Sequence, residues 1–222
     1  MMPKPAKPEI DNHINKLIVG MIALSLPVLT NYFSEAPLDS ISASYHQGFW
    51  ARDIFVGFLF AIAAFLFSYN GLSNTERILS KVAALACLGV ALFPCDCGTG
   101  IEIIPGLHYV SAGVMFTILV VFCYSFHLRA IGKGHPQAKV RAWIYALCGL
   151  VIIIAMVILG IDFLTGESIK HHIPRIVFYG EAAGLIAFGI AWLTASRTLP
   201  ILTTKNERIA ILPTGGKTEK SP

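Results

Sequence analysis

Long apolar runs separated by short polar stretches recur along the whole chain. Hydropathy identifies six of them as candidate membrane spans, at residues 17–33, 54–69, 82–94, 107–126, 143–163 and 176–195. The first three are shorter than the roughly 20 residues that cross a bilayer upright, so their helices must include flanking residues. The pattern therefore predicts an all-α fold, a polytopic membrane helix bundle of six transmembrane helices.

Composition supports this class of protein. Of the 222 residues, 55% are hydrophobic and only 14% are charged, which lies outside the usual range of soluble proteins. We expect a disordered cytoplasmic lead at 1–13, a transmembrane domain at 14–197 and a flexible cytoplasmic tail at 198–222. No clear small-x-small cleavage site follows the first run, so we expect span 17–33 to be retained rather than cleaved as a signal peptide.

Basic residues predict the orientation. Of the 17 Lys and Arg residues, only Arg52, Lys170 and Arg175 lie in segments opposite the termini. The positive-inside rule then places both termini in the cytoplasm. The net charge of +4 thus reflects topology and contact with membrane lipid, and gives no reason to expect a nucleic-acid partner. Alkaline phosphatase fused after Thr99 should be active, and fused after Lys133 it should be inactive.

The second span has two unlike faces. At helical spacing, small and polar residues share one face and bulky apolar residues share another. Because small residues allow helices to approach closely in lipid, the small face is predicted to pack inward, with Asp53 pointing into the bundle. The two sets are Asp53, Gly57, Ala61, Ala64 and Ser68 against Phe55, Leu59, Ile62 and Leu66.

Ionisable residues gather at the predicted outer ends of the spans. His108 and Ser111 lie one turn apart, and Glu181 lies about two turns, roughly 8 to 9 Å, inside the last span. A carboxylate at that depth needs a partner or a proton, because an unpaired charge there costs several kcal/mol. An interfacial histidine bonded to backbone or water is the alternative for His108. We predict one polar chamber, open to the outside and lined by Asp53, His108, Ser111, Asp162, Arg175 and Glu181.

Small residues mark the last span as a packing helix. Gly180 and Gly184 form a G-x-x-x-G pattern, which is typical of closely packed membrane helices. We therefore expect Gly184→Leu to damage assembly. Glu181→Gln, which keeps the shape of the side chain, should fold nearly normally and alter any ligand, metal or proton-linked property.

Cys95 and Cys97 are the only cysteine pair predicted to face an oxidising compartment. A C-x-C pair alone supplies half of a metal site. The sequence leaves free thiols, a mutual disulfide and a metal role open.

The strings SISASYH, ARDIFVG, ALFP, HYVSAG and GEAAGLIAFGIAWL resemble those of a bacterial group of six-span inner-membrane proteins of unknown function. This resemblance implies a multi-pass protein of the bacterial inner membrane without implying an activity. More distantly, the chain is similar to the CREST-type membrane hydrolases, which include alkaline ceramidases and bind zinc. The matching residue types would be Ser111, His108 and Asp53. That superfamily has paired histidines in its last helix, whereas this chain has Glu181 there and no histidine.

Three functions remain open, and the sequence does not decide whether the protein is an enzyme. The favoured one is binding of a lipid headgroup or small ligand. The others are a zinc-dependent outer-leaflet hydrolase of lipid amide or ester bonds and a proton-linked carrier that titrates Glu181 and Asp53. The candidate residues are Arg52, Arg175 and Tyr179 for ligand binding; Asp53, His108, Ser111 and Glu181 for catalysis; and His108, His171 and His172 for zinc. The oligomeric state stays open.

Overall fold

The computed structural model of the protein describes residues 12–97, 103–204 and 207. Over these residues the chain is helical and has no strand. Thr99, most of the predicted lead and most of the predicted tail lie outside them. The elements are α1 (Asn12–Tyr32), α2 (Ser44–Gln47), α3 (Phe49–Ser68), α4 (Asn74–Leu92), α5 (Leu107–Ile131), α6 (Pro136–Leu164), α7 (Ser168–His172), α8 (Ile176–Ala195) and a short 3₁₀ helix, η1 (Pro200–Leu202).

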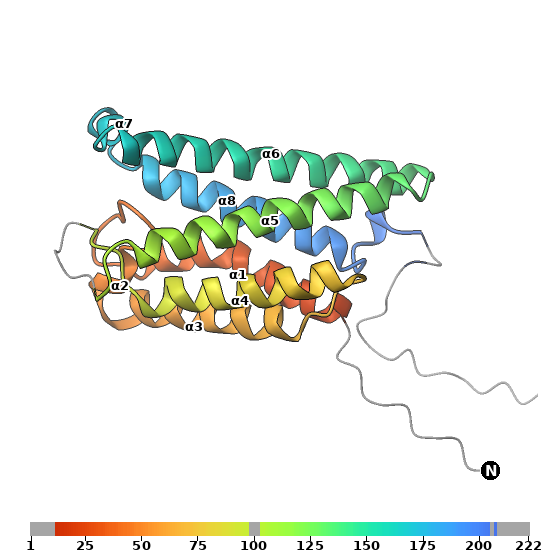
Figure 1. Ribbon diagram of the computed structural model, residues 1–222, viewed down its shortest axis with the longest axis horizontal. Coiled ribbons are helices and arrows are strands. Elements are labelled where there is room, and N and C mark those ends of the chain that lie inside the picture. The colour runs from red at the N-terminus through yellow and green to blue at the C-terminus, as the bar shows by residue number, and fades with distance from the viewer. Residues whose placement is uncertain (1–11, 98–102, 205–206, 208–222) are drawn as a thin grey trace, which may run out of the picture.

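Six long helices lie side by side and close into a ring (Figure 1). Following the chain, α3 packs on α1, α4 on α3, α5 on α4 and α6 on α5, and α8 closes the ring between α6 and α1. The short helices α2 and α7 lie at the same end of the bundle. We call this end, which also holds Cys95 and Cys97, the disulfide end, and the opposite end the tail end.

Five of the described helices are long and apolar enough to cross a membrane, namely α1, α3, α5, α6 and α8. The sixth long helix, α4, is less apolar because Glu76, Arg77 and Lys81 occupy its first two turns. The sequence predicted only residues 82–94 as a span, whereas the helix begins at Asn74. The chain is thus an all-helical bundle in which at least five helices suit a membrane by length and composition.

The face that α3 turns inward is the opposite of the predicted one. Phe55, Leu59 and Leu66 are buried in the core, whereas Gly57 and Ala64 are exposed. The prediction that the small face packs inward is therefore wrong. The middle of the ring has to be filled by side chains at close-packed density, and bulky residues supply this volume where small ones cannot.

Ion pairs close the tail end. Arg141 of α6 donates hydrogen bonds to Leu202 O (2.5 Å) and to Glu207 (2.9 Å), and Glu207 also pairs with Lys133. Burial acts to raise the pKa of Glu207, but the hydrogen bonds from Lys133 and Arg141 outweigh it and lower the pKa to about 2. The tail therefore docks on the α5–α6 connection at least as far as Glu207.

This docking should depend on pH. The pKa of Glu207 is lower in the folded protein than its usual value of 4.5, so its contribution to stability is complete above pH 4.5 and is lost as the pH falls toward 2. We expect Glu207→Gln to melt at a lower temperature than wild type at pH 7, and the difference to vanish near pH 2. Melting curves in detergent across this range measure it. Glu35→Gln, at an exposed position, is the control. A difference in melting temperature between wild type and Glu207→Gln that stays constant with pH would contradict the lowered pKa of Glu207.

Candidate functional site

The connection between α1 and α2, residues 33–43, folds back into the disulfide end of the ring. Leu38 and Ile41 on it are buried. The backbone N–H of Phe178 in α8 donates a hydrogen bond to Asp39 O (2.9 Å). The connection thus packs on the first turns of α8. This contact places Ser42 inside the bundle.

Glu181 of α8 takes its hydrogen bonds from this connection. Its carboxylate accepts one from Ile41 N (2.5 Å) and one from the Ser42 hydroxyl (3.2 Å). The sequence indicated that a carboxylate at this depth needs a partner. The partners are a backbone N–H and a hydroxyl, neither of which the sequence pattern identified.

Ser42 also joins Glu181 to His108, at the start of α5. His108 is 3% exposed; its Nε2 lies 3.0 Å from Ser42 Oγ and its Nδ1 lies 2.8 Å from Phe93 O. Because a carbonyl oxygen only accepts, Nδ1 carries a hydrogen. We call Glu181, Ser42 and His108 the polar triad.

Two proton arrangements satisfy the hydrogen bonds that join the three residues of the polar triad. In one, Nε2 of a charged His108 donates to Ser42, and Ser42 donates to an ionised Glu181. In the other, a protonated Glu181 donates to Ser42, and Ser42 donates to a neutral His108. Both hold the same number of protons, so they differ only in which end of the triad carries the extra proton.

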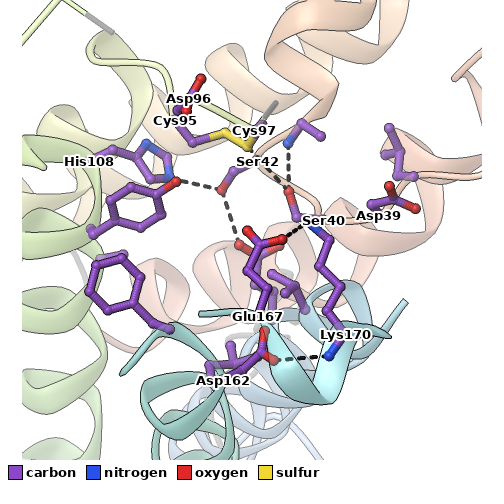
Figure 2. A pocket seen from close by; sticks show the side chains of 18 of the residues that line it. Asp39, Ser40, Ser42, Cys95, Asp96, Cys97, His108, Asp162, Glu167 and Lys170 are labelled. Carbon is purple, nitrogen blue, oxygen red and sulfur yellow. Dashed lines mark hydrogen bonds and ion pairs between the residues drawn. A yellow bond between two sulfur atoms is a disulfide. The ribbon is translucent and has the colours of Figure 1, made fainter. Parts of the chain in front are cut away.

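A cavity of about 550 Å³ opens beside the polar triad (Figure 2). Its lining is polar toward the disulfide end and apolar deeper in the bundle. Phe116 of α5 and Met156 of α6 lie in its deep part, each roughly 12 to 14 Å along its helix from the disulfide end. Gly113 and Gly160 leave open space in its wall, since no described atom lies within 4 Å of a Cβ built on either. The cavity is therefore amphipathic and has room for a ligand.

Three charged residues at one side of the cavity are held by hydrogen bonds or an ion pair, namely Asp162, Lys170 and Glu167. Asp162, at the end of α6, is buried and accepts hydrogen bonds from Ile169 N (2.8 Å) and Lys170 N (2.9 Å), so it caps the short helix α7. Lys170 Nζ pairs with Glu167 at 2.9 Å. Figure 2 shows this pair on the side of the cavity away from His108.

The same cavity is lined by a disulfide between Cys95 and Cys97. Of the three states that the sequence left open, the structure has the bonded one. The carbonyl of Cys95 lies 2.7 Å from His46 Nε2, and Cys97 Sγ lies 3.7 Å from Ser40 Oγ. The disulfide is thus held next to the polar part of the cavity.

Only part of the predicted chamber comes together. His108, Asp162 and Glu181 line the cavity. Asp53 does not: its side chain is 63% exposed and pairs with Arg52 at 3.3 Å on the surface of α3. The prediction that Asp53 points into the bundle is wrong, because α3 turns its other face inward.

Ser111 is buried but points toward α4. A Cβ built on Gly89 of α4 would lie only 2.3 Å from Ser111 Oγ, so the two helices touch at this position. Ser111 is therefore a packing residue in this structure and is not part of the cavity lining.

The remaining predicted residues also lie elsewhere. Arg175 donates to Leu38 O (2.9 Å) and Asn31 Oδ1 (2.6 Å), so it ties the start of α8 to the end of α1. Tyr179, His171 and His172 are exposed and do not line the cavity. Across the described part of the chain, no three His, Cys, Asp or Glu side chains gather where they could hold a metal ion. The zinc hypothesis gains no support from these residues.

Sequence reasoning missed Ser42, the place of the disulfide beside it, and Lys170 at the other side of the cavity. The signal available for Ser42 was the serine-rich composition of its segment, in which Ser40, Ser42 and Ser44 alternate with other residues. No family model, curated protein or solved structure matches this chain.

Proposed function

We propose that the protein spans a membrane six times, with the disulfide end outside and both termini in the cytoplasm. Two observations support this orientation. The disulfide requires an oxidising side, and Arg129, Lys133 and Arg141 lie at the opposite end. In this proposal α4 is the sixth span, and it lies between two apolar helices. Lys81 in its second turn donates to Phe67 O and lies over the Phe67 ring, as a lysine near a membrane interface does. The sequence resemblance favours the bacterial inner membrane.

In this proposal the function is to bind an amphiphile in the cavity. The observation that carries it is the division of the lining, polar around the triad and apolar around Phe116 and Met156. A cavity of about 550 Å³ has the size of known small-molecule sites, which are mostly apolar with a few placed polar groups. The headgroup would lie against Glu181, Ser42 and His108, and its apolar part between α5 and α6.

The charges of the lining favour a headgroup with hydroxyl or amine donors. Among the described residues, the lining holds one lysine, Lys170, which pairs with Glu167, against five carboxyl groups: Asp39, Asp96, Asp162, Glu167 and Glu181. A phosphate group would meet repulsion from these carboxylates. From the sequence we expected a lipid headgroup at Arg52 and Arg175, which do not line the cavity; we now propose a neutral or cationic headgroup within it.

A lipid ester hydrolase is the second candidate, because Ser42 Oγ and His108 Nε2 are 3.0 Å apart, as in a nucleophile and its base. Against it, the backbone N–H of Ile41 beside Ser42 is bonded to Glu181 and is not directed at a substrate oxyanion. A proton-linked carrier would use the proton exchange of the triad. It has less support, since the cavity lies only at the disulfide end.

Glu181→Gln and Gly113→Leu test the binding proposal. Glu181→Gln should fold, because the amide can still accept from Ile41 N and donate to Ser42, which then donates to a neutral His108. Loss of a hydrogen bond to a charged group costs roughly 1.5–3 kcal/mol, so retention of the amphiphile should fall at least about tenfold. Gly113→Leu fills the open space and should abolish retention. Native mass spectrometry and extraction of copurified lipid measure both.

Gly57→Leu is the matched control. Gly57 is also a helical glycine with open space around it, but it lies on the outer face of α3. The Gly57→Leu variant should retain the same amphiphile as wild type. Equal retention by all four proteins, or a bound mixture no different from bulk lipid, would contradict the proposal.

A further inference from the structure

We propose that the Cys95–Cys97 disulfide is a redox site that exchanges with small thiols entering the cavity, and that they attack Cys97 Sγ. The two sulfurs differ in access. Both cysteines line the cavity, but Cys95 is 1% exposed, whereas Cys97 is partly exposed. Figure 2 shows the disulfide beside Ser40 and Ser42. An incoming thiolate can therefore reach Cys97 from the cavity more readily than Cys95, which is nearly covered by protein.

The position of the disulfide in the chain does not suit a structural role. A disulfide stabilises a fold chiefly by closing a loop of the unfolded chain, and this effect grows with loop length. Only Asp96 lies between the two cysteines. The segment is already held from both sides, by His46 against Cys95 O and by Ser40 against Cys97 Sγ. The bond therefore adds little to stability, which leaves a chemical role.

The reaction is a thiol–disulfide exchange in two steps. The thiolate of a small thiol bonds to Cys97 Sγ, the Cys95–Cys97 bond breaks, and Cys95 leaves with the electron pair and takes a proton. A second thiolate then attacks the sulfur of the first small molecule, and Cys97 leaves. In total, two small thiols become one small disulfide and the protein disulfide becomes a dithiol. The hydroxyl of Ser40 donates toward Cys97 Sγ and stabilises the Cys97 thiolate that leaves in the second step.

Native-state thiol labelling of the full chain in lipid nanodiscs tests this. Reduced glutathione is the probe, followed by a maleimide and peptide mapping, which separates Cys95 and Cys97 from the buried thiols Cys87, Cys123 and Cys148. Wild type should carry no label on either cavity cysteine before glutathione and one on each after it, while the protein stays folded. Labelling that appears only after denaturation would overturn the proposal. The readout does not depend on the amphiphile, so this result is independent of the binding proposal.

Two single variants test which sulfur is attacked. Cys95→Ser leaves Cys97 facing the cavity and should take up glutathione from its disulfide at least about tenfold faster than Cys97→Ser, because access limits exchange. Equal rates would overturn the assignment to Cys97. Ser40→Ala, made in the Cys95→Ser background, should move the pH profile of Cys97 alkylation to higher pH; an unchanged profile would remove Ser40 from the reaction. If a variant fails to fold, the wild-type labelling still decides the main claim.

Discussion

Gly189→Leu is expected to lower the free energy of unfolding by about 3 kcal/mol, the upper part of the usual range for overpacking. A Cβ on Gly189 of α8 would lie 2.9 Å from the backbone oxygen of Gly20 in α1, and a Cβ on Gly20 would lie 2.9 Å from the backbone oxygen of Gly189. A backbone oxygen cannot rotate away as a side chain can. The two helices must therefore separate, which opens the ring where α8 joins α1. Thermal melting and size exclusion in detergent measure the loss, which should reach roughly 10 °C.

Gly184→Leu and Gly57→Leu are the matched controls. At Gly184 the obstructing atom is Cε1 of Phe116, at 2.8 Å, and this side chain can move into the cavity. The expected loss at Gly184 is therefore smaller than at Gly189, although the sequence pattern pointed to Gly184 as the packing residue. Gly57 has open space and should tolerate leucine. Equal melting temperatures for Gly189→Leu and Gly57→Leu, within experimental error, would contradict the close contact between α1 and α8.

Trp192→Ala should destabilise the protein by about 4 kcal/mol, as large core truncations do. Trp192 of α8 is 0% exposed, and its ring lies 5.2 Å from Phe188, 5.4 Å from Tyr69 and 5.9 Å from Phe122. These rings come from three different helices or their ends, so the cavity left by alanine cannot close without moving helices. The lost dispersion contacts count in lipid as they do in water.

Trp143→Ala is the control for this prediction. Trp143 lies on α6 and is 77% exposed. Its replacement should leave the melting temperature in detergent nearly unchanged. Equal losses for the two tryptophans would mean that the aromatic cluster does not hold the bundle together.

The helices could be predicted from sequence because apolar runs of their length have few other solutions. The last helix, Ile176–Ala195, has the predicted bounds, and α5 begins at Leu107 as expected. The rotation of a helix about its axis was harder to predict. For α3 both faces are apolar enough for lipid or core, so the choice depends on the volume left by α1 and α4, which no local pattern contains.

Part of the candidate site could be predicted from the sequence. His108 and Glu181 were placed at one end of the bundle because both are polar groups in apolar helices. Ser42 could not be placed, because it lies on a connection whose path is determined by contacts such as that of Asp39 O with Phe178 N. Asp53 was predicted to point into the bundle, but it lies on the surface because α3 turns its other face inward.

Photo-crosslinking from inside the cavity tests whether the cavity holds an amphiphile. A benzophenone amino acid replaces Phe116, which lines the cavity, or Phe60, which is exposed on α3, and membranes are irradiated before purification. Position 116 should capture one class of amphiphile with a hydroxyl or amine headgroup, and Glu181→Gln should reduce this capture. Position 60 should capture bulk lipid. Capture of the same bulk lipid mixture at both positions, unaffected by Glu181→Gln, would contradict the binding proposal.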